Sequence, residues 1–310
     1  MWARLIASLP EVQLSCVLCR NEAKRAPFEE YGVPLVGSYE QAFSYAADAA
    51  LVCVSKKDNF AVSRYLSELG CSVLCETPAG MTEEERSAFS ELPVQIAEQY
   101  PLHPIFAAVR KVCEQGLIGT VGVLELSCCH GYHAAALMRS LLGTGFCRPQ
   151  VKAVHFSDSY VVHAGRQGEF APECRENKRT AAYLDFGGKK AFYDWSDGQY
   201  FSSVRRGGFR LQGTCGELSG TGGVTFSGGY AATFSFDRIY DGRGGSLYPP
   251  DLAAINCLGM RVYENRYRGL RLSEEEIAMA ESLRLFLDGQ GYSARDGAFD
   301  AEIAQLMSGE

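Results

Sequence analysis

The sequence lacks several features that mark special classes of protein. None of its apolar runs approaches the roughly 20 residues that a membrane-spanning helix needs. Its first residues do not combine a charged region with a long apolar core, as a secretory signal does. Acidic residues outnumber basic ones by 37 to 30, and the formal net charge of −7 argues against electrostatic binding to nucleic acid or to an acidic membrane. We therefore expect a cytoplasmic protein that binds neither.

The sequence also lacks a compact disulfide framework, because its 12 cysteines are scattered over the whole chain. This distribution fits a reducing compartment. Cys16 and Cys19 have the spacing of a metal knuckle, but residues three apart on a predicted strand point to opposite faces. The segment 128–133 contains two cysteines and two histidines, yet it straddles a predicted strand-to-helix junction, from which four zinc ligands do not converge easily. We predict no metal site.

The first part of the chain alternates short apolar strands with helices. Such alternation, with nearly continuous apolar strands, predicts a doubly wound parallel sheet of the nucleotide-binding type. Capping boxes at Ser38-x-x-Gln41 and Thr82-x-x-Glu85 mark two helix starts. The predicted strands are 12–18, 32–36, 49–54, 71–76 and 94–97, and the predicted helices include 2–9, 21–31, 39–46 and 58–69.

From residue 121 the pattern changes to alternating apolar and polar residues between Gly-rich turns. This pattern predicts a mostly antiparallel sheet with one solvated face. We predict two domains, 1–103 and 104–310. The predicted strands of the second domain are 121–127, 151–162, 180–186, 190–195, 209–214, 224–226 and 230–239, and its predicted helices are 104–115, 252–263, 273–287 and 299–307.

One stretch, Gly70-Cys-Ser-Val-Leu-Cys-Glu-Thr-Pro78, is an apolar strand that ends in a carboxylate, a hydroxyl and a proline. Open α/β sheets bind ligands at such strand ends. The stretch resembles the "GkhVlcEKP" motif of the glucose–fructose oxidoreductase / inositol dehydrogenase (Gfo/Idh/MocA) family of NAD(P)-dependent dehydrogenases. Further segments resemble the same family in order along the chain, at 9–14, 30–34, 47–52, 94–100, 114–121 and 130–143. The resemblance implies a Rossmann-type parallel α/β domain, then an α+β domain with a mostly antiparallel open sheet and C-terminal helices.

The resemblance also implies catalytic residues. The lysine of the family's E-K-P motif is Thr77 here, which forms hydrogen bonds but supplies no charge. The family's Asp-x-x-x-His motif reads Cys129-His-Gly-Tyr-His133, so that only the histidine is kept. His133 is then expected to transfer the proton, because a neutral imidazole accepts a hydroxyl proton as hydride leaves. A helix-capping or core histidine is the alternative, and His130 is the second catalytic candidate.

Cofactor-binding residues follow from the same resemblance. Glu76 and Pro78 match the motif and are expected near the nicotinamide, and Ser55 and Gln99 complete the predicted contacts. The acidic residue that would hold a ribose hydroxyl at the end of the second strand is replaced by Cys19, and Arg20 follows it. An arginine at this place accommodates a 2′-phosphate, so NADP is slightly favoured over NAD. An ordinary surface arginine is the alternative.

The family's first strand and its G-x-G-x-x-G loop are absent from this sequence. The loop lets the backbone approach the pyrophosphate at a helix N-terminus. The segment 289–294 fits the letters of the motif but follows a predicted helix, and we interpret it as a chance match. We expect a fragment or a misplaced start rather than a true loss, because the first strand lies in the middle of the sheet.

Two functions remain open from the sequence. The first is an NAD(P)-dependent oxidoreductase that acts on a sugar, a polyol or a related hydroxyl or carbonyl compound. The second is an inactive family member that binds or regulates, which the changed motifs favour. Aromatic residues at 193–201, beside two aspartates, fit a sugar-binding cluster or an ordinary sheet face. The family resemblance further implies a homodimer or homotetramer that pairs through the second-domain sheet.

Overall fold

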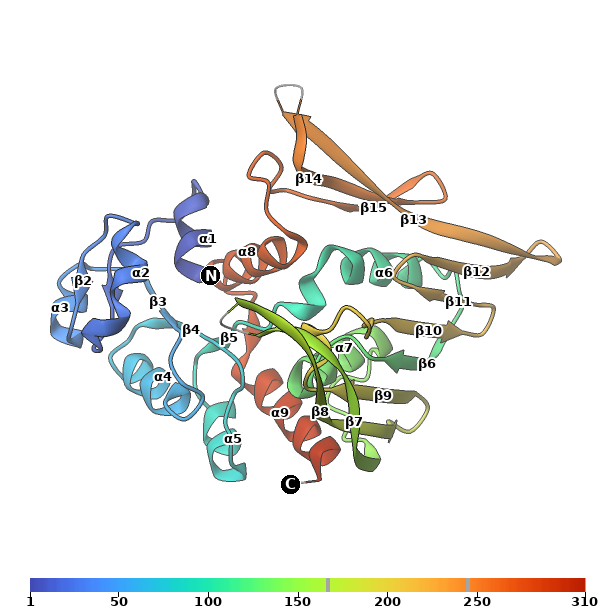
Figure 1. Cartoon of the computed structure of the whole chain (residues 1–310), viewed down its shortest axis with the longest axis horizontal. Coiled ribbons are helices and arrows are strands. Elements are labelled where there is room, and N and C mark those ends of the chain that lie inside the picture. The colour runs from blue at the N-terminus through green and yellow to red at the C-terminus, as the bar shows by residue number, and fades with distance from the viewer. Residues whose placement is uncertain (166–167, 244–245, 310) are drawn as a thin grey trace.

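A computed structural model describes residues 1–165, 168–243 and 246–309 (Figure 1). In its first part, two short strands pair in parallel, β1 (Val17–Leu18) and β2 (Leu35–Val36). A second sheet has the order β16-β5-β4-β3, with three parallel strands and one antiparallel edge strand. Its strands are β3 (Ala49–Val52), β4 (Ser72–Cys75), β5 (Gln95–Ile96) and β16 (Tyr292–Ser293). The helices between them are α1 (Trp2–Ser8), α2 (Ala26–Glu29), α3 (Tyr39–Phe43), α4 (Asn59–Glu68) and α5 (Glu83–Ser90). The predicted Rossmann-like α/β architecture is confirmed.

Helix ends in this part follow the sequence signals. Thr82 caps α5 with a complete capping box, in which Glu85 returns a hydrogen bond to the backbone of Thr82. Ser38 caps α3, but the Gln41 side chain accepts from the backbone of Gly37 instead of completing the box. Gly70, with φ +81°, follows α4 and turns the chain into β4.

The second part is a ten-stranded sheet with the order β15-β14-β13-β12-β11-β10-β6-β9-β8-β7. Every neighbouring pair in it is antiparallel except β6 and β9. The predicted mostly antiparallel domain is therefore confirmed. The strands are β6 (Val121–Leu126), β7 (Gln150–Gly165), β8 (Gly168–Asp185), β9 (Lys190–Ser196), β10 (Phe209–Gly213), β11 (Gly216–Ser219), β12 (Gly222–Ser227), β13 (Tyr230–Arg243), β14 (Ser246–Cys257) and β15 (Met260–Glu264).

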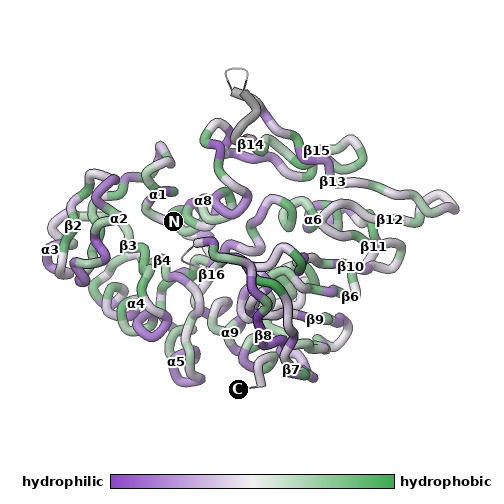
Figure 2. The backbone as a smooth tube through the Cα atoms, in the orientation of Figure 1, coloured by the Kyte–Doolittle hydropathy of each residue, from purple (hydrophilic) through white to green (hydrophobic). Residues whose placement is uncertain are grey.

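The second part also contains the helices α6 (Pro104–Glu114), α7 (Gly131–Leu142), α8 (Glu274–Leu287) and α9 (Ala294–Ser308). Helix α9 lies between α5 and the large sheet and packs against α7 (Figure 1). Because β16 pairs with β5, the C-terminal segment returns to the first sheet. The hydrophobic stretches follow this core, whereas much of β8 is hydrophilic (Figure 2).

The predicted helix 252–263 is wrong, since this segment forms the hairpin of β14 and β15. Leu252, Ala253, Ala254 and Ile255 are all buried, so the strand is covered on both faces and shows no alternation. The hairpin turns at 258–259, where both residues have positive φ.

Other predicted elements change in extent. The strand predicted at 12–18 is formed only at Val17–Leu18. The helix predicted at 21–31 splits into a 3₁₀ turn, η1 (Glu22–Lys24), and α2, because Pro27 has no N–H to continue a single helix. The last helix begins at Ala294 rather than at residue 299, since Ser293 caps it.

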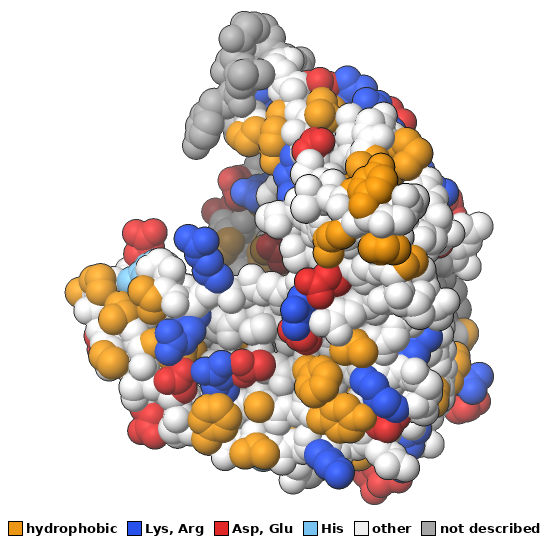
Figure 3. Space-filling view, turned by 90° about the vertical axis from the view of Figure 1, so that its right-hand side faces the viewer, with side chains coloured by type: hydrophobic (Ala, Val, Ile, Leu, Met, Phe, Trp, Pro, Cys, Tyr) orange, Lys and Arg blue, Asp and Glu red, His pale blue; other side chains and the backbone are white. Residues whose placement is uncertain are grey.

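No helix in the described ranges has the length and apolarity needed to cross a membrane. On the face seen in Figure 3, hydrophobic side chains form separate patches, and charges of both signs are interspersed between them.

Candidate active site

Two carboxylates lie just after neighbouring parallel strands. Glu76 follows β4, and its backbone N–H donates to the Val52 carbonyl at the end of β3 at 3.0 Å. Glu98 lies two residues after β5. Carboxyl ends of adjacent parallel strands meet at one edge of a sheet, which is where such sheets bind ligands. The first turn of α7 brings His133 to this edge from the second part of the chain.

His133 and Glu98 form a buried pair. The Nδ1 atom of His133 lies 2.6 Å from Oε2 of Glu98, and the two side chains are 8% and 2% exposed. The second oxygen of Glu98 accepts the backbone N–H of Tyr100 at 3.0 Å, which fixes the carboxylate. When a neutral His133 donates from Nδ1, its Nε2 atom is left as a proton acceptor. A carboxylate held against an imidazole also stabilises the protonated ring.

Aromatic rings surround this pair. The His133 ring centroid lies 4.4 Å from that of Tyr100, 4.5 Å from that of Tyr132 and 5.0 Å from that of His130. The hydroxyl of Tyr200, in η3 (Gln199–Phe201), lies 2.9 Å from the Tyr100 hydroxyl and 3.2 Å from His130 Nδ1. Burial raises the pKa of both tyrosines, so they keep their hydroxyl protons. A chain of hydrogen bonds thus connects the cluster to Tyr200, whose side chain is partly exposed.

Glu76 is fixed from two sides. The indole N–H of Trp2 donates to one carboxylate oxygen at 2.5 Å, and the Thr77 backbone N–H donates to the other at 3.2 Å. Burial raises the pKa of Glu76, against the opposing effect of these two hydrogen bonds and of the nearby His133. Glu76 therefore joins Glu98 and His133 in one electrostatic cluster. The Thr77–Pro78 peptide bond that follows is cis.

The other predicted cofactor residues lie at the same strand ends or farther away. Ser55, after β3, uses its hydroxyl to donate to Asp58 at 2.7 Å. Its neighbour Lys56 lies 5.6 Å from the Tyr132 ring centroid, which brings this turn close to the histidines. Gln99 directly follows Glu98. Arg20 is exposed and lies two residues after β1, which belongs to the separate two-stranded sheet.

Several residues of the cluster were not predicted from the sequence. Glu98, Tyr100 and His103 lie within or just beyond the segment that follows β5, and only the position after an apolar strand could have indicated them. Burial lowers the pKa of His103 to about 4, with Glu98 and His133 among the groups that affect it. Its Nε2 atom is buried without a hydrogen-bond partner in the described part of the chain.

These residues fit the nicotinamide end of a dinucleotide. The Oε1 atom of Gln99 is a buried acceptor that lacks a partner among the described residues, and a ribose hydroxyl or a carboxamide would satisfy it. The turns after β3 and β4 add Ser55, Glu76 and Pro78 at the same edge. Across residues 1–165, 168–243 and 246–309, no group of three or more His, Cys, Asp or Glu is placed to hold a metal ion.

The fold and this edge define a Rossmann-type α/β protein with a second, antiparallel domain. Residues 1–98 match the family described as "Oxidoreductase family, NAD-binding Rossmann fold", GFO_IDH_MocA. The resemblance seen in the sequence is therefore confirmed for residues 1–98, which match the NAD-binding Rossmann fold of the Gfo/Idh/MocA oxidoreductase family.

Solved structures share the whole fold at low sequence identity. An oxidoreductase from Agrobacterium radiobacter, in complex with NAD+, L-tartaric acid and magnesium, has a TM-score of 0.65 and 13% identity, over 99% of this chain and 91% of that one. Biliverdin reductase from Synechocystis, in complex with biliverdin and NADP+, has a TM-score of 0.63 and 17% identity, over 99% and 93%. An oxidoreductase from Thermotoga maritima has a TM-score of 0.64 and 16% identity, over 98% and 90%. No curated protein matches the chain.

Proposed function

We propose that the protein is an NAD(P)-dependent oxidoreductase in which His133 transfers the proton and Glu98 positions the His133 ring. The observation that carries the proposal is the 2.6 Å contact between His133 Nδ1 and Glu98 Oε2, at the carboxyl ends of parallel strands. A histidine with only a structural role in the core needs no buried carboxylate beside it. Burying an ionised group is costly unless a partner or a ligand balances its charge.

Each residue of the candidate active site has a proposed role. A nicotinamide held at this edge would supply the hydride chemistry at the substrate carbon. The Nε2 atom of His133 accepts the substrate's hydroxyl proton in the oxidation direction and returns it in reduction. Glu98 keeps the ring oriented and stabilises the imidazolium. The hydroxyls of Tyr100 and Tyr200 keep their protons and form hydrogen bonds around the reacting oxygen, and Thr77 orients this oxygen at most.

The proposed substrate is a small sugar-like or polyol-like hydroxyl compound. Support comes from the family resemblance and from a site that mixes imidazole, hydroxyl and aromatic groups. The ligands named for two similar structures, L-tartaric acid and biliverdin, are both small molecules. We also propose pairing through the large sheet. Its strands carry exposed apolar side chains, which include Phe156, Phe192, Phe226 and Ile239.

Cofactor binding is tested with the intrinsic fluorescence of the chain. Trp2 and Trp195 are its two tryptophans, and Trp2 touches Glu76 at the expected nicotinamide position. Titration with NADH or NADPH should quench tryptophan emission to saturation by energy transfer to the reduced nicotinamide. The W2F variant should still bind and should show less quenching, because Trp2 lies next to the expected nicotinamide position.

Equilibrium dialysis provides the binding measurement that does not depend on fluorescence. The two nucleotides compared side by side decide between NAD and NADP, and R20A should weaken only NADPH if Arg20 holds the 2′-phosphate. If neither nucleotide binds, the enzyme proposal fails.

The alternative, an inactive binding protein, is favoured by one specific residue, Thr77. In that case the T77K variant should gain activity, since it restores the lysine of the family motif. We expect instead that T77K leaves kcat for polyol oxidation unchanged or lower, because His133 transfers the proton and a new ammonium group would alter the Glu76–Glu98–His133 cluster. A rise in kcat of about tenfold or more would show that Thr77 marks a disabled site.

A further inference from the structure

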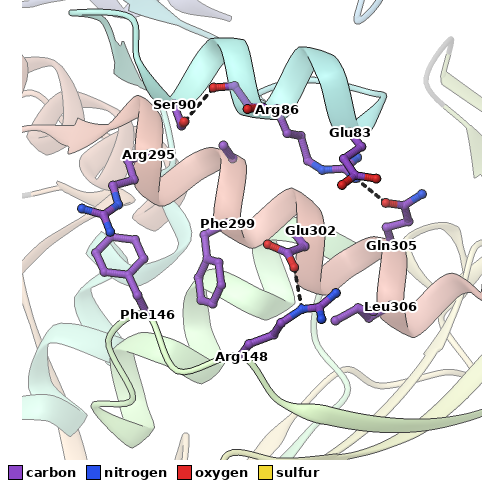
Figure 4. A pocket seen from close by; sticks show the side chains of 12 residues that line it. Glu83, Arg86, Ser90, Phe146, Arg148, Arg295, Phe299, Glu302, Gln305 and Leu306 are labelled. Atoms are coloured by element: carbon purple, nitrogen blue, oxygen red, sulfur yellow. Dashed lines mark hydrogen bonds and ion pairs between the residues drawn. The ribbon is translucent and has the colours of Figure 1, made fainter.

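A groove of about 480 Å³ lies between α5 and α9, and no residue of the candidate active site lines it (Figure 4). Glu83 lies beside Arg86 in its wall, and Arg148 pairs with Glu302 at 2.7 Å. The charges in this groove are of both signs, so they do not indicate a missing ion. A charge without such a counterpart lies instead at the candidate active site, on Lys56.

Lys56 reaches from the first part of the chain toward the helix that carries His133. It is exposed and lies in the turn after β3. Its Nζ atom lies 5.6 Å from the ring centroid of Tyr132, in the first turn of α7. The Tyr132 ring in turn contacts those of His130 and His133, with centroids 5.0 and 4.5 Å away. The ammonium group is thus one aromatic ring away from the imidazole that is proposed to transfer the proton.

The two buried carboxylates at this edge are fully engaged by the protein. One oxygen of Glu98 faces His133 and the other accepts a backbone N–H. One oxygen of Glu76 accepts the Trp2 indole N–H and the other accepts a backbone N–H. Each of the four carboxylate oxygens therefore has a partner within the protein, and none is an ion-pair partner of Lys56.

Lys56 itself has no hydrogen-bond or ion-pair partner among residues 1–165, 168–243 and 246–309. The nearest acidic residue along the chain, Asp58, accepts the Ser55 hydroxyl instead. An ammonium group carries three donors, and an aromatic face offers them no lone pair. A hydrogen bond to an anion is also stronger than a cation–π contact at an exposed site. Lys56 is therefore available to an anion at the entrance of the site.

We propose that Lys56 binds an anionic group of the substrate, at the end opposite to the hydroxyl that contacts His133. An ammonium group binds a carboxylate or a phosphate as a point charge, so the two anionic groups share this chemistry. The preferred substrate is then a polyol acid or a polyol phosphate rather than a neutral polyol. This assignment rests on the proposed function, because it takes His133 as the residue that contacts the reacting hydroxyl.

Isothermal titration calorimetry of the full chain with D-gluconate, D-glucitol 6-phosphate and D-glucitol tests the assignment, with NADH or NADPH present. At least one anion should bind more tightly than D-glucitol, and the tighter of the two identifies the anionic group. K56Q should weaken the binding of this anion about tenfold or more, since a hydrogen bond between two charged groups is lost. K56R keeps the charge and should retain most of the affinity. The matched control is K57Q, because Lys57 is the adjacent exposed lysine, and this change should leave binding unaltered.

Steady-state kinetics provide the second readout. K56Q should raise KM for the anion about tenfold or more and change kcat little, because the contact is equally strong before and during the reaction. Lys56 is exposed, so its substitution removes no core contact. Equal affinity of K56Q and the unaltered protein for the anion would overturn the role of Lys56, as would the failure of both anions to bind more tightly than D-glucitol. Binding that depends on Lys56 without turnover with either nucleotide would support the anion site and contradict the oxidoreductase proposal.

Discussion

Replacing His133 with asparagine lowers kcat for polyol oxidation by about 10²–10⁴-fold, the usual contribution of a positioned general acid or base. Asparagine fills similar space but cannot accept the substrate proton at neutral pH. Nucleotide affinity should change little, because the proposed role of His133 is in the proton transfer. Steady-state kinetics together with the dialysis assay separate the two effects.

The matched control is H155N, on β7, where the exposed His155 bonds only to Thr180 at 3.1 Å in the described contacts. This variant should retain kcat within about twofold. E98Q tests the positioning residue. It should lower kcat less than H133N does and leave KM nearly unchanged, because the neutral amide still holds the ring but no longer stabilises the imidazolium that forms during the reaction. A purely structural Glu98 would instead lower the free energy of unfolding and leave kcat unchanged. Normal turnover by H133N would contradict the mechanism.

Replacing Arg139 with methionine should lower the free energy of unfolding by about 3–5 kcal/mol, the cost of removing one partner of a buried ion pair. Arg139 is 7% exposed on its side chain and joins α7 to α9 through Asp300 at 2.8 Å and Asp296 at 2.7 Å. It also donates to the Gly145 carbonyl at 2.8 Å. Urea denaturation measures the loss.

The pH dependence of this variant has a definite sign. Burial raises the pKa of Asp300 to about 7, although Arg139 opposes the shift. A carboxyl whose pKa is raised in the folded state stabilises that state at low pH. This contribution to the free energy of unfolding is lost as the pH rises through the folded-state pKa. Without Arg139 the pKa of Asp300 is raised further. R139M should therefore lower the free energy of unfolding more at about pH 9 than at about pH 5.

Two further variants make the test specific. R139M/D300L removes both charges and should recover much of the lost stability, because no charge is left buried. R148M breaks the exposed Arg148–Glu302 pair and should cost less than about 1 kcal/mol. If R139M costs no more than R148M, the buried network does not connect the helices as described.

The sequence by itself determined both halves of the fold. Short apolar strands punctuated by capped helices indicated the parallel sheet, since the Thr82 cap and the glycine at 70 act through local backbone geometry. Alternation after residue 121 indicated the antiparallel sheet. Local signals failed at 252–263, because a strand buried on both faces has the same continuous apolar pattern as a buried helix.

For the candidate site as well, the sequence indicated some residues and only the tertiary structure brought the others together. The sequence indicated His133 and Glu76 through motifs that are contiguous in the chain. Only the tertiary structure brought Glu98 against His133, 35 residues away, and Tyr200 against His130, 70 residues away. Strand order and the docking of α7 on the sheet edge decide these contacts. Pairings between distant segments depend on how complete elements pack, which no local spacing of residues encodes.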